Sequence, residues 1–322
     1  MLPTPDDVDA AARRLQGRIV HTPMLRNAHL DALTGGVILI KPECLQRTGS
    51  FKFRGALNAT LQLGPAPSAG VVAYSSGNHG QALACAAAGL GMAAHVFMPA
   101  DAPRVKVDST RRWGAEVIPY DRITDDRAAL SAAYAARTGA ALIPPFDHPD
   151  VIAGQGTLAL ELAGDAAEAG LTLDTLLVCT GGGGMVAGCA LAMERASPGT
   201  SIVAVEPEGA DDTARSLASG QRETNPPGGS TLCDALLSAT PGEMTFAINR
   251  TRLARGIAVS DDAVLNAMAF AFTHLKLVME PGGAVCLAAL LSGAFDARGR
   301  TVGIVLSGGN VDAAVFARAL AA

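Results

Sequence analysis

The chain has 322 residues and a formal net charge of −5; 49% of its residues are hydrophobic and 17% are charged. This length favours two lobes over a single core, and the composition is typical of a compact globular protein. A negative net charge without any run of Lys or Arg argues against a nucleic-acid partner.

The N-terminal residues 1–7 contain no basic segment followed by an apolar one, so they do not read as a signal peptide. The apolar run at residues 82–94 is interrupted by Gly89 and Gly91 and is too short to span a bilayer. We therefore expect a cytoplasmic protein without a membrane partner.

The predicted elements begin with a helix at residues 5–17, for which Thr4 can provide the cap. A strand at 37–40 and a helix at 51–63 follow. The Gly- and Pro-rich residues 64–70 predict a linker, and we expect the first domain boundary there.

Strands and helices then alternate as far as residue 143. The predicted strands are 71–74, 93–98, 116–119 and 141–143, and the predicted helices are 80–90, 103–113 and 124–137. Because helices separate these strands, they should pair in parallel through right-handed crossovers. The turn-rich residues 144–150 end this small α/β lobe.

The second half of the chain continues in the same way. Its predicted strands are 175–179, 201–205, 256–259 and 301–306, its predicted helices are 154–169, one ending near 196, 211–219, 261–274, 282–293 and 310–320, and residues 221–230 are a predicted loop. The expected fold class is α/β, with residues 1–65 and 149–322 in a large domain and residues 66–148 in a small one.

Lys52 lies between Phe51 and Phe53 at the start of a predicted helix. Burial among apolar groups lowers the pKa of a lysine and favours the neutral amine, so Lys52 is a candidate Schiff-base lysine. The alternative is an exposed lysine on the first helical turn, and this stretch alone does not decide between the two.

Four glycines, Gly181, Gly182, Gly183 and Gly184, stand between an apolar strand and a predicted helix. Backbone N–H groups converge at such a place and the helix dipole favours an anion, which predicts a phosphate cradle. The alternative is a flexible linker. The nucleotide-binding pattern G-x-x-x-x-G-K-[ST] is not present.

Two further polar turns follow predicted strands, at residues 75–81 and 307–310. Ligands of open α/β sheets bind at the carboxyl ends of the strands, so these turns could hold a small polar ligand. The alternative for the first turn is that it only caps a helix. Three polar turns and one candidate lysine favour a single cleft.

The sequences Thr48–Lys52, Ser75–His79, Gly181–Gly184 and Ser307–Asn310 resemble those of fold-type-II pyridoxal-phosphate enzymes, in particular the serine/threonine dehydratase and serine racemase family. The resemblance covers nearly the whole chain in order. It implies a tryptophan synthase β-like architecture of two lobes, each with a mostly parallel sheet flanked by helices. The large domain would bind the cofactor, the small domain would face the substrate, and the protein would form a homo-oligomer, a dimer.

The resemblance also implies roles for single residues. Lys52 would carry pyridoxal 5'-phosphate as a Schiff base with Phe51 beside it, and the four glycines with Met185 would bind its phosphate. Asn78 would contact the cofactor's phenolic oxygen and Ser307 its ring nitrogen. Because a neutral hydroxyl does not hold a proton on that nitrogen as a carboxylate would, β-elimination is favoured over transamination.

For the substrate, the resemblance places the α-carboxylate among Ser75, Ser76, Asn78 and His79. Ser76 matches the second acid/base of the racemases, on the face opposite Lys52, and is therefore a candidate catalytic residue.

Residues 205–212 resemble the divalent-cation loop of this family, with Glu206, the Ala210 carbonyl and Asp212 as ligands. Oxygen ligands suit Mg²⁺, Ca²⁺ or Mn²⁺. The alternative is an acidic turn on the surface.

Arg127 stands at the start of a predicted helix, on the expected edge of the cleft. In racemase relatives an arginine at this position can reach the second carboxyl group of a dicarboxylate, and a guanidinium can bind that group bidentately. The alternative is that Arg127 pairs with Asp125 or Asp126 on a solvated helix. Ser238 is a further candidate for the distal substrate group.

The expected activity is that of a pyridoxal-phosphate-dependent dehydratase, or ammonia-lyase. It would eliminate water from a β-hydroxy amino acid to give a 2-oxo or imino acid and ammonia. Arg127 favours 3-hydroxyaspartate as the substrate, with iminosuccinate and oxaloacetate as products. The alternatives are an L-serine/L-threonine dehydratase, a serine racemase with dehydratase side activity, and a non-catalytic amino-acid-binding relative.

Overall fold

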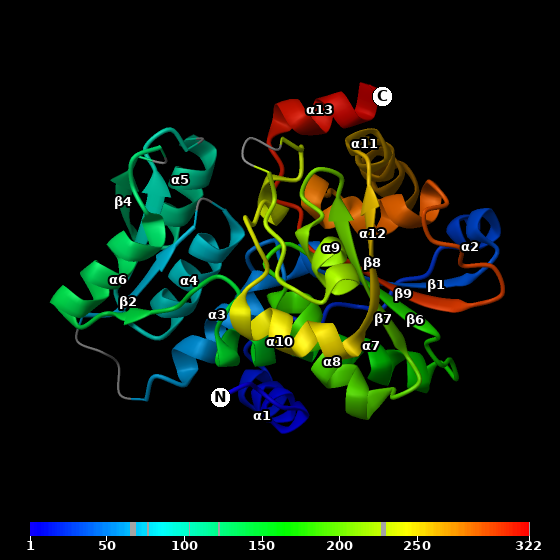
Figure 1. Ribbon diagram of the computed structural model, residues 1–322, viewed down its shortest axis with the longest axis horizontal. Helices are drawn as coiled ribbons and strands as arrows, with labels where there is room; N and C mark the ends of the chain where they lie inside the picture. The colour runs from blue at the N-terminus through cyan, green and yellow to red at the C-terminus, as the bar shows by residue number, and fades with distance from the viewer. Residues whose placement is uncertain (65–68, 76, 103, 122, 227–229, 322) are drawn as a thin grey trace.

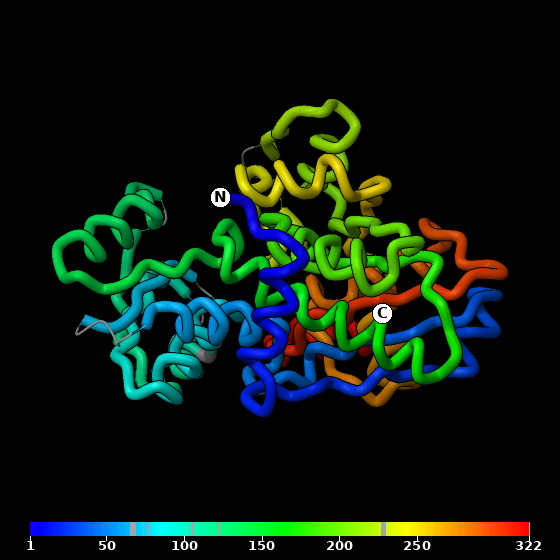
Figure 2. Tube along the Cα trace, turned by 90° about the horizontal axis from the view of Figure 1, so that it is seen from below, coloured from blue at the N-terminus to red at the C-terminus, as the bar shows by residue number. Residues whose placement is uncertain are grey.

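The computed structural model describes residues 1–64, 69–75, 77–102, 104–121, 123–226 and 230–321. The chain forms two sheets, each with its own helices, and Figure 1 shows the two units side by side. They stay separate in the perpendicular view of Figure 2, in which the N-terminal helix lies against the larger unit. The predicted α/β class with two parallel sheets is confirmed.

The larger sheet has five parallel strands. In spatial order they are β1 (Val37–Pro42), β9 (Thr301–Leu306), β6 (Thr175–Cys179), β7 (Ser201–Pro207) and β8 (Leu253–Val259). The central strands are buried along nearly their whole length, as expected for a parallel sheet with helices on its faces. Helix α12 (Pro281–Leu291) packs on β6 to β9, and α8 (Gly184–Ala196) on β6 and β7.

The smaller sheet has four parallel strands. In spatial order they are β4 (Glu116–Tyr120), β3 (Ala94–Pro99), β2 (Val71–Tyr74) and β5 (Ala141–Leu142). Helices α4 (Asn78–Gly89), α5 (Arg104–Arg112) and α6 (Arg127–Thr138) belong to this unit. The strands of this sheet all lie between residues 71 and 142, while the exact domain bounds remain a prediction.

Further helices surround the larger sheet. They are α1 (Pro5–Leu15), α2 (Ala28–Thr34), α7 (Pro149–Glu168), α9 (Asp212–Ser219), α10 (Glu243–Arg252), α11 (Asp261–Phe270) and α13 (Ala313–Ala321), with short helical turns η1 (Glu43–Leu45) and η2 (Asp234–Leu236) and a π-helical turn η3 (Ala271–Leu275). Among the described residues, no helix has both the length and the apolar composition of a membrane span.

All nine predicted strands are present, and their ends differ from the predicted ones by three residues at most. The larger differences between prediction and structure are in the helices. Helix α10 was not predicted because its N-terminus is capped from a distance: the Asp147 carboxylate accepts hydrogen bonds from the backbone N–H groups of Glu243 and Thr245. The predicted helix 261–274 is wrong in its last turn, which is η3.

Two more helices differ from the sequence prediction. Helix α2 was missed although Asn27 caps it and Gly35 ends it, because it is only 7 residues long. Helix α7 begins at Pro149 instead of residue 154, since the His148 side chain accepts a hydrogen bond from the Asp150 backbone and so starts the helix earlier.

Helix α3 (Lys52–Leu61) lies where the two units meet. It packs against α4 of the smaller unit and against α1 and α7 of the larger one. Helices α3 and α7 cross at glycines: a Cβ atom added to Gly154 would lie 2.7 Å from the Cα atom of Gly55. This close contact fixes the position of α3 on α7.

A buried ion network fixes α3 further. The Arg54 guanidinium donates to Glu43 through Nε (2.7 Å) and to Glu161 through Nη1 (2.7 Å), and Lys41 Nζ donates to the other oxygen of Glu161 (2.6 Å). Arg54, Glu43 and Lys41 are 0% exposed. Burial alone would lower the pKa of Arg54, but the two carboxylates outweigh it and raise this pKa. The two buried cations thus face the carboxylates of Glu43 and Glu161, with Asp165 4.0 Å from Lys41 Nζ at the edge of the network.

We predict that Arg54→Met lowers the free energy of unfolding by about 3–5 kcal/mol, because it leaves the buried Glu43 carboxylate without its cation. Urea denaturation measures this difference. The matched control is Arg298→Met, which removes an exposed ion pair with Asp296 and should leave the unfolding midpoint unchanged. Equal midpoints for wild type and Arg54→Met would contradict the role of the network.

Candidate active site

A pocket lies between the two units at the carboxyl ends of β2, β6 and β9. Its wall contains Ser75 after β2, Gly181 after β6 and Ser307 after β9. The space inside is about 1090 Å³, its open mouth included. Parallel sheets gather ligand-binding groups at this edge, and the three predicted polar turns meet there.

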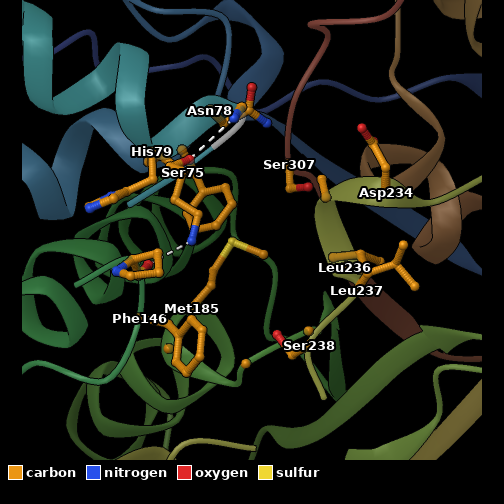
Figure 3. Close-up of a pocket in the computed structure, with 18 of the residues that line it drawn as sticks. Ser75, Asn78, His79, Phe146, Met185, Asp234, Leu236, Leu237, Ser238 and Ser307 are labelled. Atoms are coloured by element: carbon orange, nitrogen blue, oxygen red, sulfur yellow. Dashed lines mark hydrogen bonds between the residues drawn. The ribbon is translucent and has the colours of Figure 1, made fainter. Parts of the chain in front are cut away.

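Most of the sequence-predicted site residues line this pocket. They are Phe51, Lys52, Ser75, Asn78, His79, Arg127, Gly181, Gly182, Gly183, Gly184, Met185, Ser238 and Ser307. In Figure 3, Ser75, Asn78 and His79 lie on one side and Ser307 and Ser238 on the other. Ser76 is outside the residues that the structure describes. The predicted metal ligands lie elsewhere in the chain and do not line the pocket.

Backbone pairing brings Lys52 next to Ser307. Ser50 forms an antiparallel bridge with Gly308, the Phe51 N–H donates to the Ser307 carbonyl (3.0 Å), and the Gly309 N–H donates to the Gly49 carbonyl (2.9 Å). The loop before α3 is thus joined to the turn after β9, about 260 residues later in the chain.

The Lys52 side chain is partly buried and reaches into the pocket, where Nζ donates to the Pro145 carbonyl at 2.7 Å. Burial lowers the pKa of Lys52 to about 8, although the Glu280 carboxyl opposes this shift. A substantial fraction of the amine is therefore neutral near pH 8 and can act as a nucleophile. The alternative of an exposed lysine on a helical surface does not describe this position.

The four glycines form a cradle with no room for side chains. A Cβ atom on Gly182 would lie 2.5 Å from the Phe146 ring, and one on Gly181 would lie 2.9 Å from the Leu236 carbonyl oxygen. Gly183 has φ of +89°, a conformation that favours glycine, and α8 begins at Gly184. Within the described residues, the N–H groups of Gly181, Gly182 and Gly183 have no hydrogen-bond acceptor. They are free for an anion, and binding of a phosphate there stays a prediction.

His79 is 2% exposed, and its Nε2 lies 2.8 Å from the Ile143 carbonyl, which can only accept. Burial, followed by the nearby charge of Lys52, lowers the pKa of His79 to about 3, so the ring is neutral. Nε2 therefore carries the proton, and Nδ1 is an acceptor without a partner among the described residues. The His79 ring therefore has no N–H group left to donate to the substrate's α-carboxylate. The predicted contact between His79 and that carboxylate would use the backbone N–H groups at the start of α4 instead.

Arg127 lies at the first position of α6, with its guanidinium carbon 5.5 Å from the centre of the Tyr74 ring. The predicted alternative, an ion pair with Asp125 or Asp126, does not occur. Asp126 instead caps α6 by accepting from Ala128 and Ala129 N–H groups, and Asp125 accepts from the Asp121 N–H. Among the described residues the guanidinium has no carboxylate partner and is available to a ligand in the pocket.

Several lining residues were not predicted. An ion pair joins Lys106 of α5, in the smaller unit, to Asp234 of η2, in the larger one. No local sequence pattern identifies this pair, because its two members are 128 residues apart. Glu280 also lines the pocket, directly before Pro281 at the first position of α12. In the sequence, the position of a polar residue shortly before a predicted helix was the only indication that Glu280 could line a site.

The predicted metal ligands lie at the end of β7 and the start of α9. Both oxygens of the Glu206 carboxylate accept backbone N–H groups, from Thr213 at 2.9 Å and Ala214 at 2.7 Å. Asp212 accepts from Asn225 through Oδ1, while its Oδ2 is buried and has no partner among the described residues. Burial, with repulsion from Asp212, raises the pKa of Glu206 to about 8, and burial raises that of Asp212 to about 6. Two buried carboxylates and one free oxygen fit a cation.

Comparison with known proteins agrees with this geometry. A family model described as "Pyridoxal-phosphate dependent enzyme" matches residues 15–308. An L-threo-3-hydroxyaspartate ammonia-lyase from Pseudomonas sp. is 46% identical, over 98% of this chain and 97% of that one. A serine racemase from Schizosaccharomyces pombe is 39% identical, over 99% and 98%. The crystal structure of a threonine deaminase from T.th. has a TM-score of 0.91 and 44% identity, over 96% of this chain and 99% of that one.

Proposed function

The chain belongs to the family of pyridoxal-phosphate-dependent enzymes, and we propose that it is a lyase that eliminates water from a β-hydroxy amino acid, after which hydrolysis of the imine gives a 2-oxo acid and ammonia. The observation that carries this proposal is that the partly buried amine of Lys52 shares one pocket with the glycine cradle. We further propose that the substrate is 3-hydroxyaspartate, as in the ammonia-lyase relatives.

The residues of the pocket fit pyridoxal phosphate. The free N–H groups of Gly181, Gly182 and Gly183 suit its phosphate, and Lys52 Nζ suits its aldehyde carbon. Asn78 and Ser307 would contact the oxygen and the nitrogen of its ring, with Phe51 and Met185 beside it. When bound, the cofactor withdraws electrons from the α-carbon of the amino acid and so stabilises negative charge there.

Lys52 has a second role in this proposal. The neutral Lys52 amine would also serve as the base that removes the α-proton of the substrate, for which a pKa of about 8 is suitable. Hydroxide then leaves the β-carbon, and with that proton the elimination releases one water. The enamine product becomes an imine, whose hydrolysis yields a 2-oxo acid and ammonia. From 3-hydroxyaspartate these products are iminosuccinate and then oxaloacetate. The acid/base role of Ser76 stays a prediction.

Arg127 supports the choice of substrate. Its guanidinium lines the pocket without a carboxylate partner among the described residues, so it can bind the second carboxylate of 3-hydroxyaspartate. Ser238 lines the same pocket and could assist. Serine and threonine have no group that uses a cation at this place. The contact of Ser75, Asn78 and the start of α4 with the α-carboxylate also remains a proposal.

The second candidate is serine racemase with dehydratase side activity, since a relative of that name is 39% identical to the chain. A serine or threonine dehydratase is the third, since a relative named L-threonine ammonia-lyase is 36% identical. The cytoplasmic location and the homodimer expected from the sequence remain predictions.

We also propose that Glu206, the Ala210 carbonyl and Asp212 bind a divalent cation, Mg²⁺, Ca²⁺ or Mn²⁺. The buried Asp212 Oδ2 without a partner supports this site. No cluster of three or more His, Cys, Asp or Glu side chains suited to a metal occurs within the described part of the chain, so water molecules would complete the coordination.

Replacing Lys52 with alanine should abolish ammonia release and the visible absorption of the lysine-bound cofactor, because the other lysine among the described pocket residues, Lys106, is ion-paired with Asp234. Ammonia release is measured with the 3-hydroxyaspartate stereoisomers, L-serine and L-threonine, and D-serine formation is followed in parallel. The control is Lys276→Ala, which changes an exposed lysine that donates to the Thr273 carbonyl. Turnover by Lys52→Ala would refute the assignment, and D-serine forming faster than ammonia would favour the racemase.

Replacing Arg127 with leucine should lower kcat/KM for 3-hydroxyaspartate about 100-fold, mainly through KM, as expected for one lost charge-assisted interaction. The value for serine should stay within about twofold, because serine has no second carboxylate. Arg137→Leu is the matched control: it lies on the same helix and also stacks on a tyrosine, but it does not line the pocket. Equal losses for both substrates would contradict the role of Arg127.

Adding Mg²⁺ should raise the melting temperature, and Asp212→Asn should abolish this effect, whereas Asp211→Asn should keep it. The effect should be larger at pH 8.5 than at pH 6. Because the folded state holds the protons of Glu206 and Asp212 more tightly than the unfolded state, its stability without a cation falls as the pH rises through this range. A cation binds the charged forms and reverses that loss. A melting temperature independent of Mg²⁺, Ca²⁺ and Mn²⁺ at both pH values would refute the site.

A further inference from the structure

Glu280, Asn78 and Asn310 form a chain of hydrogen bonds along one wall of the pocket. We propose that Glu280 and Asn310 are positioning residues, which fix the Asn78 side-chain amide so that it presents an N–H group, and never its oxygen, to the cofactor. This inference rests on the proposed function, since it assumes that pyridoxal phosphate binds in this pocket.

A backbone carbonyl determines which atoms donate and which accept in this series of hydrogen bonds. Asn310 Nδ2 lies 2.9 Å from the Thr48 carbonyl oxygen, which can only accept, so this atom of Asn310 must be the NH₂ group. The same Nδ2 lies 2.7 Å from the Asn78 side chain. A donor on this side requires an acceptor on the other, and Asn78 therefore turns Oδ1 towards Asn310.

The hydrogen bond at the other end of the series, to Glu280, has a consistent direction. With its oxygen towards Asn310, Asn78 points Nδ2 at Glu280 and donates to Oε1 at 2.6 Å. Glu280 is 5% exposed and has no ion pair among the described residues. Burial raises the pKa of Glu280 to about 8, while the Asn78 hydrogen bond opposes the shift. A carboxyl oxygen that bears no proton accepts a hydrogen bond whether the group is charged or neutral. The direction of these hydrogen bonds therefore does not depend on the pKa of Glu280.

Space around Glu280 is restricted as well. A Cβ atom on Gly308 would lie 2.0 Å from Glu280 Oε1, and the Glu280 N–H donates to the Gly308 carbonyl at 3.1 Å. The carboxyl group is thus held against the turn after β9, directly beside Ser307.

Asn78 Nδ2 carries two hydrogens, and Glu280 takes one of them. No described residue accepts the second, and Asn78 lines the pocket. The pocket therefore offers a donor at this place and accommodates an oxygen that accepts, such as an ionised phenolic oxygen. If the amide were turned over, its oxygen would face that oxygen and repel it. The hydrogen bond to the buried Glu280 thus disfavours the turned-over state.

Three variants test the proposal through the binding of pyridoxal phosphate. Glu280→Gln removes the charge but keeps an acceptor oxygen of the same shape. Glu280→Ala removes the acceptor. Asn310→Asp acts at the opposite end and replaces the donor by an oxygen. The readouts are the dissociation constant of the cofactor, from fluorescence titration, and the wavelength of its visible absorption, with circular dichroism as the check on folding.

Glu280→Gln should bind the cofactor within about twofold of wild type and keep its absorption wavelength. Glu280→Ala and Asn310→Asp should each bind about tenfold more weakly, the effect of one lost hydrogen bond, and shift that wavelength. If Glu280→Gln loses as much as Glu280→Ala, the charge matters and the positioning proposal is overturned. Wild-type binding by both Glu280→Ala and Asn310→Asp would overturn it too. If Glu280→Ala does not fold, Asn310→Asp and Glu280→Gln decide alone. A wild-type protein that binds no cofactor would instead overturn the proposed function.

Discussion

The buried Arg54 guanidinium links the helix that carries Lys52 to the larger unit. It lies two residues after Lys52 and binds Glu43, which follows β1, and Glu161 on α7. A shift of α3 along its axis would separate these buried charges, which is costly where no water can replace a partner. The position of the Lys52 amine therefore depends on a network that does not itself line the pocket.

From this fixed point the pocket is assembled from distant parts of the chain. Parallel strands bring Ser75, Gly181 and Ser307 to one edge, although some 230 residues separate the first from the last. The backbone pairing of Ser50 with Gly308 then sets Lys52 beside Ser307. Since the strands run in parallel, polar turns at their carboxyl ends converge without any contact that is local in sequence.

This is why much of the pocket could be predicted from the sequence. Apolar runs identify the strands, and the polar turns that follow them give Lys52, Asn78 and the glycines as neighbours. Interacting residues that are far apart in the sequence cannot be recognised from such local patterns. The Asp147 carboxylate that caps α10 and the Lys106–Asp234 ion pair depend on how the chain folds back on itself. Glu280 was missed for the same reason, because its partner Asn78 lies 202 residues earlier.

The groups that would hold the cofactor's phosphate and ring nitrogen and the group that would select the substrate come from different parts of the protein. The glycine cradle and Ser307 belong to the larger unit, and Arg127 belongs to α6 of the smaller one. Relatives named for 3-hydroxyaspartate, serine and threonine all match this chain over nearly its full length, so fold alone does not decide the substrate. In the proposed function, a change of charge at the first position of α6 would alter what the pocket can bind without disturbing the cradle. If the proposed roles hold, substrate preference would change at Arg127 while the Lys52 chemistry stays the same.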